Sequence, residues 1–287
     1  MPQEAALFPS DRFARWGSAL ALAFALAGCG GGSDAPVEAA APAPSPAPTR
    51  FAYVVNSFDN TVSAYTADAG TGALTPVAGS PFATGGLPMD VAVDPAGRFV
   101  YVSNYDDRNV SAFAIDASTG ALTPVAGTPF AAGLGPAGVE IDPASRFAYV
   151  SNIASNSISG YAIDAGTGAL TAMPGPAFAT GGGPTQVEID PTGRFAYAMN
   201  QLGATVSAYT IDAGTGALTA VAGSPFAAGS RPVGVAIDPA GQFVYVSNQL
   251  GASVSAYTIH TDTGALTPLA GPPIATGGGP WDIAFVH

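Results

Sequence analysis

The stretch Arg50-Phe51-Ala52-Tyr53 decides the fold, because it returns four more times along the chain. The copies follow at a spacing of 48 residues and read Arg98-Phe99-Val100-Tyr101, Arg146-Phe147-Ala148-Tyr149, Arg194-Phe195-Ala196-Tyr197 and Gln242-Phe243-Val244-Tyr245. A period of this length holds about four short strands, which cannot bury their apolar faces alone. Radial packing of such units buries these faces, so the sequence predicts an all-β, five-bladed β-propeller of four-stranded antiparallel blades.

Four segments of the first repeat are rich in β-branched or aromatic residues and are separated by turn residues. They cover residues 51–56, 61–66, 73–77 and 88–94. Proline cannot donate a hydrogen bond to a central ladder. The prolines in and after the third segment therefore indicate that this strand lies at an outer edge.

The repeat resembles the YVTN and lactonase-type (6-phosphogluconolactonase-like) β-propeller families. The resemblance is carried by Tyr-Val-Ser-Asn at 101–104 and 245–248, Thr-Gly-Ala-Leu-Thr-Pro at 71–76 and 119–124, and Asp-Pro-Ala-Gly-Arg at 94–98. It implies that the strand beginning Pro-x-x-Val lines the central channel and that the Leu-Thr-Pro strand is outermost. The family usually has seven blades, so five repeats depart from its pattern.

The order of the strand types bears on how the ring ends. The repeats begin with a second strand at Phe51 and finish with an innermost strand, Pro280 to Val286. We therefore expect the C-terminal inner strand to pair with the N-terminal strand, which would close the five-bladed ring and remove its free edges. An incomplete ring that is completed by association is the alternative.

Residues 1–28 read as an export signal, with a short basic region followed by an apolar run too short to span a bilayer. The run ends in Leu26-Ala27-Gly28-Cys29, which resembles the lipobox of bacterial lipoproteins. That resemblance implies cleavage before Cys29, acylation of its thiol and new amino group, and, with Gly30 next, transfer to the outer membrane. We expect an exported, lipid-anchored protein on the periplasmic or the surface side of that membrane.

Residues 29–49 contain the lipidated cysteine and a stretch rich in Gly, Ala and Pro, which is typical of an extended tether. The folded domain then covers residues 50–287. The chain has no lysine and a formal net charge of −12. An acidic chain of this kind is not expected to bind nucleic acid, and the lipid anchor should be its only contact with a membrane.

Residues that recur in every repeat are predicted to be structural, since one ring axis does not need five identical catalytic groups. We expect the tyrosines at 53, 101, 149, 197 and 245 to pack between blades, and the asparagines at 56, 104, 152, 200 and 248 to bond turns. The pairs Asp94/Arg98, Asp142/Arg146 and Asp190/Arg194 bracket tight turns, where exposed ion pairs contribute little stability.

Acidic residues vary among the inner strands and are the candidates for chemistry. They are Asp90, Glu140, Glu188 and Asp282, at the third or fifth position of their strands. Residues two apart on a strand share a face, so these carboxylates are predicted to converge on the channel. Such a group binds a cation, shares a proton or is simply hydrated. We expect a hydrated acidic channel without a ligand and no cofactor; a calcium site is the alternative.

A second group of variable residues is predicted on one face of the disc, in turns and in the loops leading to the inner strands. Aromatic and arginine side chains of this kind anchor protein partners. The candidates are Phe58, Tyr105, Arg108, Arg231 and Trp281. The alternative is ordinary loop variation with Trp281 in the core.

Two functions follow from these residues. The first is a lipid-anchored binding scaffold of the cell envelope that holds an envelope protein, a glycan or a small ligand on one face. The second, implied by the lactonase-type resemblance, is a lactone hydrolase that uses the channel carboxylates or a bound cation. The only two histidines, His260 and His287, are far apart in the sequence, and no serine lies in a Gly-x-Ser-x-Gly elbow. We therefore expect the scaffold.

Overall fold

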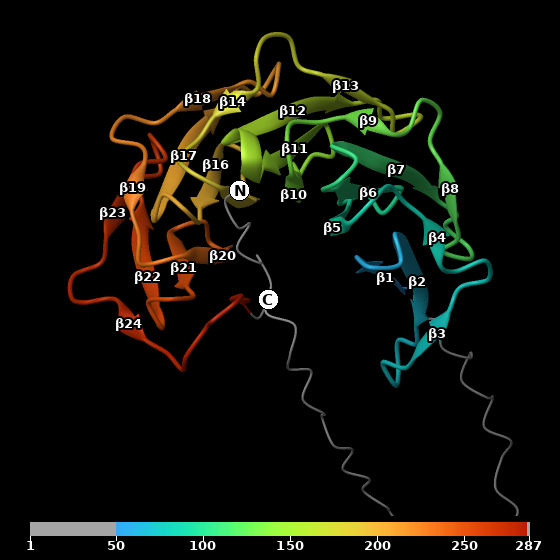
Figure 1. Ribbon diagram of the computed structural model, residues 1–287, viewed down its shortest axis with the longest axis horizontal. Helices are drawn as coiled ribbons and strands as arrows, with labels where there is room; N and C mark the ends of the chain where they lie inside the picture. The colour runs from blue at the N-terminus through green and yellow to red at the C-terminus, as the bar shows by residue number, and fades with distance from the viewer. Residues whose placement is uncertain (1–49, 286–287) are drawn as a thin grey trace, which may run out of the picture. The chain divides into compact units, whose positions relative to one another are not determined.

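The structure is a computed structural model that describes residues 50–285. These residues form five antiparallel sheets, one after another along an arc (Figure 1). Sheet 1 consists of β1 (Arg50–Asn56), β2 (Thr61–Ala67), β3 (Leu74–Pro76) and β4 (Phe82–Ala83). Sheet 2 consists of β5 (Pro88–Val93), β6 (Phe99–Asn104), β7 (Asn109–Ile115), β8 (Leu122–Pro124) and β9 (Phe130–Ala131).

The next three sheets repeat the order of sheet 2. Sheet 3 consists of β10 (Pro136–Ile141), β11 (Phe147–Asn152), β12 (Ser157–Ile163), β13 (Leu170–Ala172) and β14 (Phe178–Ala179). Sheet 4 consists of β15 (Pro184–Ile189), β16 (Phe195–Asn200), β17 (Thr205–Ile211), β18 (Leu218–Ala220) and β19 (Phe226–Ala227). Sheet 5 consists of β20 (Pro232–Ile237), β21 (Phe243–Asn248), β22 (Ser253–Ile259), β23 (Leu266–Pro268) and β24 (Ile274–Ala275).

The predicted propeller architecture is confirmed, with one addition at the outer edge of each blade. In sheet 2, the third strand β7 pairs with two short outer pieces, β8 and β9, at its two ends. Residues 125–129 separate these pieces and include Pro129, which cannot donate a ladder hydrogen bond. The sequence-based expectation of one outer strand per repeat was therefore incomplete, because the Phe-Ala pieces are too short to show a strand pattern.

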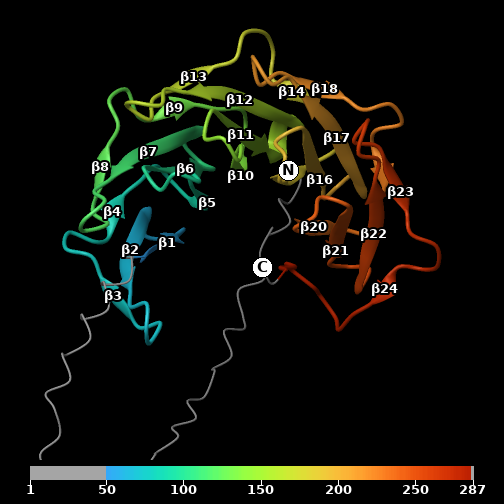
Figure 2. The same cartoon turned by 180° about the vertical axis from the view of Figure 1, so that it is seen from behind.

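The predicted pairing of the C-terminal inner strand with β1 is absent, so within residues 50–285 the ring is not closed. Residues 280–285 form no strand, and sheet 1 has no inner strand beside β1. The four blade interfaces leave the two ends of the arc apart (Figure 1), and the segment lies against sheet 5, where the Ser247 hydroxyl donates to the Trp281 carbonyl at 2.9 Å. Ser151 makes the same bond to Thr185 of the following inner strand, at 3.0 Å. Sheets 1 and 5 stand at opposite ends of the arc in both views (Figure 2).

Adjacent blades are joined by the recurring tyrosine, as predicted from its repetition. Its ring is on the second strand and its hydroxyl donates to a glycine carbonyl 67 residues later, in the outer turn of the next sheet. These bonds are Tyr53–Gly120 at 3.0 Å, Tyr101–Gly168 at 3.0 Å, Tyr149–Gly216 at 2.7 Å and Tyr197–Gly264 at 3.1 Å. The apolar clusters between sheets surround these rings, so each blade is held by its neighbour.

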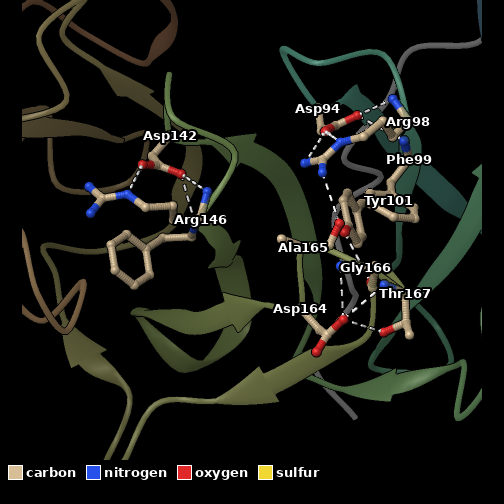
Figure 3. Close-up of polar contacts among 12 residues, drawn as sticks. Asp94, Arg98, Phe99, Tyr101, Asp142, Arg146, Asp164, Ala165, Gly166 and Thr167 are labelled. Atoms are coloured by element: carbon tan, nitrogen blue, oxygen red, sulfur yellow. Dashed lines mark hydrogen bonds and ion pairs between the residues drawn. The ribbon is translucent and has the colours of Figure 1, made fainter.

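The turn between inner and second strands adds a polar contact at the same interface (Figure 3). The buried carboxylate of Asp94 accepts the backbone N–H of Phe99 at 2.8 Å and forms an ion pair with Arg98 at 3.0 Å. The Arg98 guanidinium then donates to the Ala165 carbonyl of sheet 3 at 2.8 Å. Asp142 and Arg146 form the equivalent pair at 3.6 Å. The arginines thus bridge blades as well as pairing with their turns.

The recurring asparagines are also structural. Asn104 donates to Asn109 at 2.7 Å and to Ser111 at 2.9 Å, while its carbonyl accepts the N–H of Gly85 at 3.2 Å. Asn104 therefore connects β6 and β7 to the glycine loop that precedes β5. This agrees with the turn role predicted for it. The one helix in the described part of the chain is the short 3₁₀ helix η1 (Ile153–Ser155), and no helix there is long and apolar enough to cross a membrane.

Candidate functional site

The inner strands bring four acidic side chains toward one region. Each inner strand has an irregularity in its pairing near its third position, for example between Pro88 and Asp90 and between Pro184 and Gln186. A bulge of this kind re-aims a side chain and is common beside functional sites. Glu140 and Glu188, at the fifth position, are in regular register opposite Tyr149 and Tyr197.

Asp90 is held in place by backbone donors from two strands. One carboxylate oxygen accepts the N–H of Val91 at 2.8 Å, and the other accepts the N–H of Val139, on the neighbouring inner strand, at 3.0 Å. Burial raises the pKa of Asp90, whereas these two hydrogen bonds oppose the rise and the charge of Asp282 adds to it. With both oxygens engaged, Asp90 is a link between β5 and β10 as well as part of the acidic group.

Glu140 and Glu188 have the strongest perturbation of this group. Burial, followed by the charges of Glu188 and Asp90, raises the pKa of Glu140 well above its ordinary range. Burial, followed by the charge of Asp282, raises the pKa of Glu188 to about 7. Two neighbouring buried carboxyl groups whose pKa values are both raised are suited to serve as acid and base in one reaction. This pair does not depend on ring closure, because β10 and β15 are consecutive inner strands.

The ring closure by which we expected Asp282 to reach Asp90 is absent, since residues 280–285 do not pair with β1. Asp282 is nevertheless near enough to Asp90 and Glu188 for its charge to raise the pKa of both. A pocket between β15, β20 and the C-terminal segment is lined by Gln186, Glu188, Asp282 and Phe285, among others. Apolar side chains and the carboxyl groups of Glu188 and Asp282 therefore border the same space.

Gln186 belongs to this pocket but was not among the predicted site residues. The signal was present, because Gln186 is the only amide at the third position of an inner strand. The calcium site that we gave as an alternative stays a hypothesis. Within residues 50–285, no group of three or more His, Cys, Asp or Glu side chains is arranged to hold a metal ion.

The five candidate partner-binding residues lie in loops of the expected kind, spread over several sheets. Phe58, in the β1–β2 turn, is 95% exposed, and Trp281 is 53% exposed, so Trp281 is not a core residue. Arg108 and Arg231 adopt left-handed backbone conformations with φ of 55° and 57°. Tyr105 follows β6, and its N–H donates to the Leu87 carbonyl of the preceding loop at 3.0 Å.

Two further exposed apolar residues in this set of turns were missed. Leu202 is 75% exposed and Leu250 is 70% exposed, each in the turn after a second strand. Their signal was the repeated Gln-Leu-Gly-Ala at 201–204 and 249–252. His260 lies in an outer turn, where its Nε2 is 2.8 Å from the Thr267 hydroxyl. Cys29 and His287 lie outside the described residues.

Comparison with protein families gives one match that extends over most of the chain. The family model described as "Lactonase, 7-bladed beta-propeller" matches residues 46–133, 125–230 and 175–281. No curated protein matches the sequence.

Solved structures agree on the fold at low sequence identity. A putative 6-phosphogluconolactonase from Bacteroides fragilis is 20% identical, with a TM-score of 0.72 over 84% of this chain and 71% of that chain. A functionally unknown protein from Desulfotomaculum acetoxidans is 17% identical, with a TM-score of 0.62 over 76% of this chain and 65% of that chain. The periplasmic gluconolactonase of Pseudomonas aeruginosa is 19% identical, with a TM-score of 0.50 over 79% of this chain and 80% of that chain.

Proposed function

Because the chain belongs to the family of lactonases with a seven-bladed β-propeller fold, we propose that it hydrolyses a small lactone at the Glu140–Glu188 pair. This replaces the binding scaffold, which we expected from the sequence, with the enzyme that was the alternative there. The observation that carries the proposal is the position of two buried carboxyl groups on consecutive inner strands, each with its pKa raised by burial.

The two carboxyl groups divide the reaction between them. Near neutral pH, the ionised fraction of Glu188 accepts a proton from a water molecule. The oxygen of that water molecule attacks the lactone carbonyl carbon at the same time. Glu140, whose pKa is raised by burial and by the charges of Glu188 and Asp90, donates a proton to the ring oxygen as the carbon–oxygen bond breaks. The product is an open hydroxy acid. Proton exchange with solvent then restores Glu188 to its carboxylate and Glu140 to its acid form.

Charge at the site favours an uncharged lactone. The variable positions of the inner strands carry acids and no Lys or Arg, and the chain contains no lysine at all. A phosphorylated sugar lactone would bring a dianion toward carboxylates, whereas phosphate recognition ordinarily uses Arg or Lys. Of the two activities named for the structural neighbours, the gluconolactonase type therefore suits this pocket better than the phosphogluconolactonase type.

The test is hydrolysis of glucono-δ-lactone by the purified full-length chain, followed as acid release above the spontaneous rate. Glu188→Gln and Glu140→Gln should each lower kcat by about two orders of magnitude or more, which is the usual contribution of a positioned acid or base. Asp59→Asn, an exposed carboxylate in the β1–β2 turn, is the matched control and should keep full activity. Equal activity in all four proteins would refute the assignment.

A partner-binding face is the second candidate, and the exposed apolar turn residues favour it. Phe58, Leu202 and Leu250 are each at least 70% exposed, and large apolar side chains with such exposure mark interaction sites when they gather on one surface. Phe58→Ser with Leu202→Ser should abolish binding of envelope oligosaccharides measured by calorimetry, while Glu188→Gln should retain it. Unchanged binding in the double variant would remove this candidate.

Export and lipid anchoring remain part of the proposal. They are supported by the sequence of residues 1–29 and by a structural neighbour that is a periplasmic enzyme. Acylation of Cys29 should be visible as incorporation of labelled palmitate and should disappear in Cys29→Ser, with release of the protein from the membrane fraction. Labelling that persists in Cys29→Ser would contradict the lipobox interpretation.

A further inference from the structure

The inner strands β5, β10, β15 and β20 each direct one backbone N–H away from their sheet, at the fourth residue of the strand. In sheet 4, the Asp190 N–H donates to the Phe195 carbonyl at 3.0 Å, and hydrogen-bonded pairs alternate along an antiparallel ladder. Val187, three residues before Asp190, is therefore in a non-hydrogen-bonded pair, and its N–H points away from β16. Among residues 50–285, β15 pairs with no strand except β16, so this N–H lies on the free inner edge of the sheet (Figure 1).

The first two of these N–H groups show what kind of group they bind. Val91 and Val139 have the same orientation as Val187, because the equivalent turn bond is present in sheets 2 and 3. One carboxylate oxygen of Asp90 accepts the Val91 N–H at 2.8 Å, and the other accepts the Val139 N–H at 3.0 Å. A single carboxylate therefore spans the free edges of two neighbouring inner strands.

The same pair of donors recurs two repeats later without a carboxylate. Val187 and Val235 are the counterparts of Val91 and Val139, and Gln186 occupies the position of Asp90. Unlike the Val139 N–H, neither of these N–H groups donates to a side chain among residues 50–285. The Gln186 amide makes no hydrogen bond within that part of the chain either. The second pair of donors is therefore available to a ligand.

A cavity of about 320 Å³ adjoins this second pair of donors. It is the pocket described above, and its walls include Gln186, Glu188, Val235 and Asp282. Val187 is the residue between Gln186 and Glu188 in β15. The backbone donors, the Gln186 amide and the carboxyl group assigned as the base are thus brought together at one cavity.

We propose that the N–H groups of Val187 and Val235 bind an anionic oxygen ligand, and that during lactone hydrolysis they hold the oxyanion formed from the lactone carbonyl. The catalytic part of this proposal rests on the function proposed above. Backbone N–H groups fixed on two strands are suited to this role, because they need no reorganisation as the charge develops.

The charge balance of the reaction explains why the donors can act beside acidic residues. As the water oxygen bonds to the carbonyl carbon, its proton passes to Glu188 and the carbonyl electron pair moves to the carbonyl oxygen. The negative charge thus leaves Glu188 and appears on the oxygen held by the donors, so the net charge of the pocket does not change. When the oxyanion re-forms the carbonyl bond, the bond to the ring oxygen breaks and that oxygen takes the proton of Glu140.

The first experiment uses acetate as the probe, since it has the same carboxylate as the Asp90 side chain. The isotope-labelled full-length chain is titrated with acetate at pH 6 and followed by nuclear magnetic resonance. The amide proton signals of Val187 and Val235 should shift together with one dissociation constant. The Val139 signal is the internal control and should not shift, because Asp90 already accepts that N–H. Unshifted signals of Val187 and Val235 would overturn the anion site.

The second experiment fills the site from within the chain. Gln186→Asp places a carboxylate at the position equivalent to Asp90, so it should remove the acetate response and lower kcat about 100-fold, as expected for a lost oxyanion donor. Its melting temperature should be retained, since the Asp90 arrangement already exists in sheet 2. Thr219→Asp, at an exposed position of β18, adds the same charge to the same sheet and should keep full kcat.

Two outcomes separate this inference from the proposed function. A loss of kcat in Gln186→Asp at every pH from 6 to 9 would support the oxyanion role, whereas a loss that disappears at pH 9 would overturn it. The latter result would mean that the added charge acts only on the ionisation of Glu188. An acetate response in an unmodified chain that hydrolyses no lactone would refute the proposed function and the oxyanion role, but it would support the anion site.

Discussion

The hydroxyl of Tyr101 in sheet 2 donates a 3.0 Å hydrogen bond to the carbonyl of Gly168 in sheet 3, and the Tyr101 ring is completely buried. Burial raises the pKa of this hydroxyl, so it remains a donor throughout the physiological range. One side chain therefore supplies both the apolar contact and the directional contact of a blade interface. The interface can recur without variation because its acceptor is a backbone carbonyl.

Removing this hydroxyl should destabilise the protein measurably. Tyr101→Phe keeps the ring but leaves the Gly168 carbonyl without its partner, which costs about 1 to 3 kcal/mol for a buried acceptor. Tyr245→Phe is the control, because that hydroxyl has no partner within residues 50–285 and its loss should cost less than about 0.5 kcal/mol. Urea unfolding compares the two variants. Equal losses would contradict the role given to the bond.

The turn carboxylates should contribute more than the arginines that pair with them. Asp94→Ala removes the acceptor for the buried N–H of Phe99 and should cost about 1 to 3 kcal/mol. Arg98→Gln should cost about 1 kcal/mol or less, because its side chain is 40% exposed. The fifth repeat supports this order, since Gln242 replaces the arginine there and Asp238 still accepts the N–H of Phe243. Thermal unfolding in which Arg98→Gln is more destabilising than Asp94→Ala would contradict this order.

Most of the blade could be predicted from the sequence, because strand patterns and turn residues are local signals. The strands around Tyr53 and Tyr101, the proline-marked outer edge and the structural role of the asparagines all follow from residues within one repeat. The pieces Phe82–Ala83 and their counterparts were missed, since two residues carry no alternation. Their pairing with the third strand is visible only in three dimensions.

Ring closure was the part that the sequence could not predict. A repeat specifies its neighbour contact, such as Ser247 with Trp281, but the curvature is the sum of small angles at four interfaces. The candidate site was only partly predictable, because the proximity of two residues depends on how many blade interfaces lie between them. Glu140 and Glu188 are on consecutive inner strands, so their proximity needs only one interface, whereas Asp90 and Asp282 depend on the whole arc.

Inner-strand packing should be sensitive to a single added methyl group. A Cβ at position 138 would lie 2.8 Å from the Thr185 carbonyl and 3.0 Å from the Gln186 Cα. Gly138→Ala should therefore force β10 and β15 apart, with a loss of about 1 to 3 kcal/mol and reduced lactone hydrolysis. Gly277→Ala, where no atom lies within 4 Å, is the control and should be neutral in both measurements. Full stability of Gly138→Ala would contradict the close approach of these strands.

The raised pKa of Glu188 makes a specific prediction for stability against pH. The unfolded chain releases this proton near pH 4.5, but the folded protein holds it until about pH 7. The folded state therefore binds more protons between these values, and stability falls as the pH rises through this window. Glu188→Gln cannot ionise, so its melting temperature should exceed that of the unmodified protein at pH 8 and match it more closely near pH 4.5. Asp116→Asn is the control, because hydrogen bonds lower the pKa of Asp116 to about 2. The difference in melting temperature between this variant and the unmodified protein should therefore stay constant from pH 5 to pH 8. A Glu188→Gln difference that does not change with pH would show that this carboxyl group titrates normally.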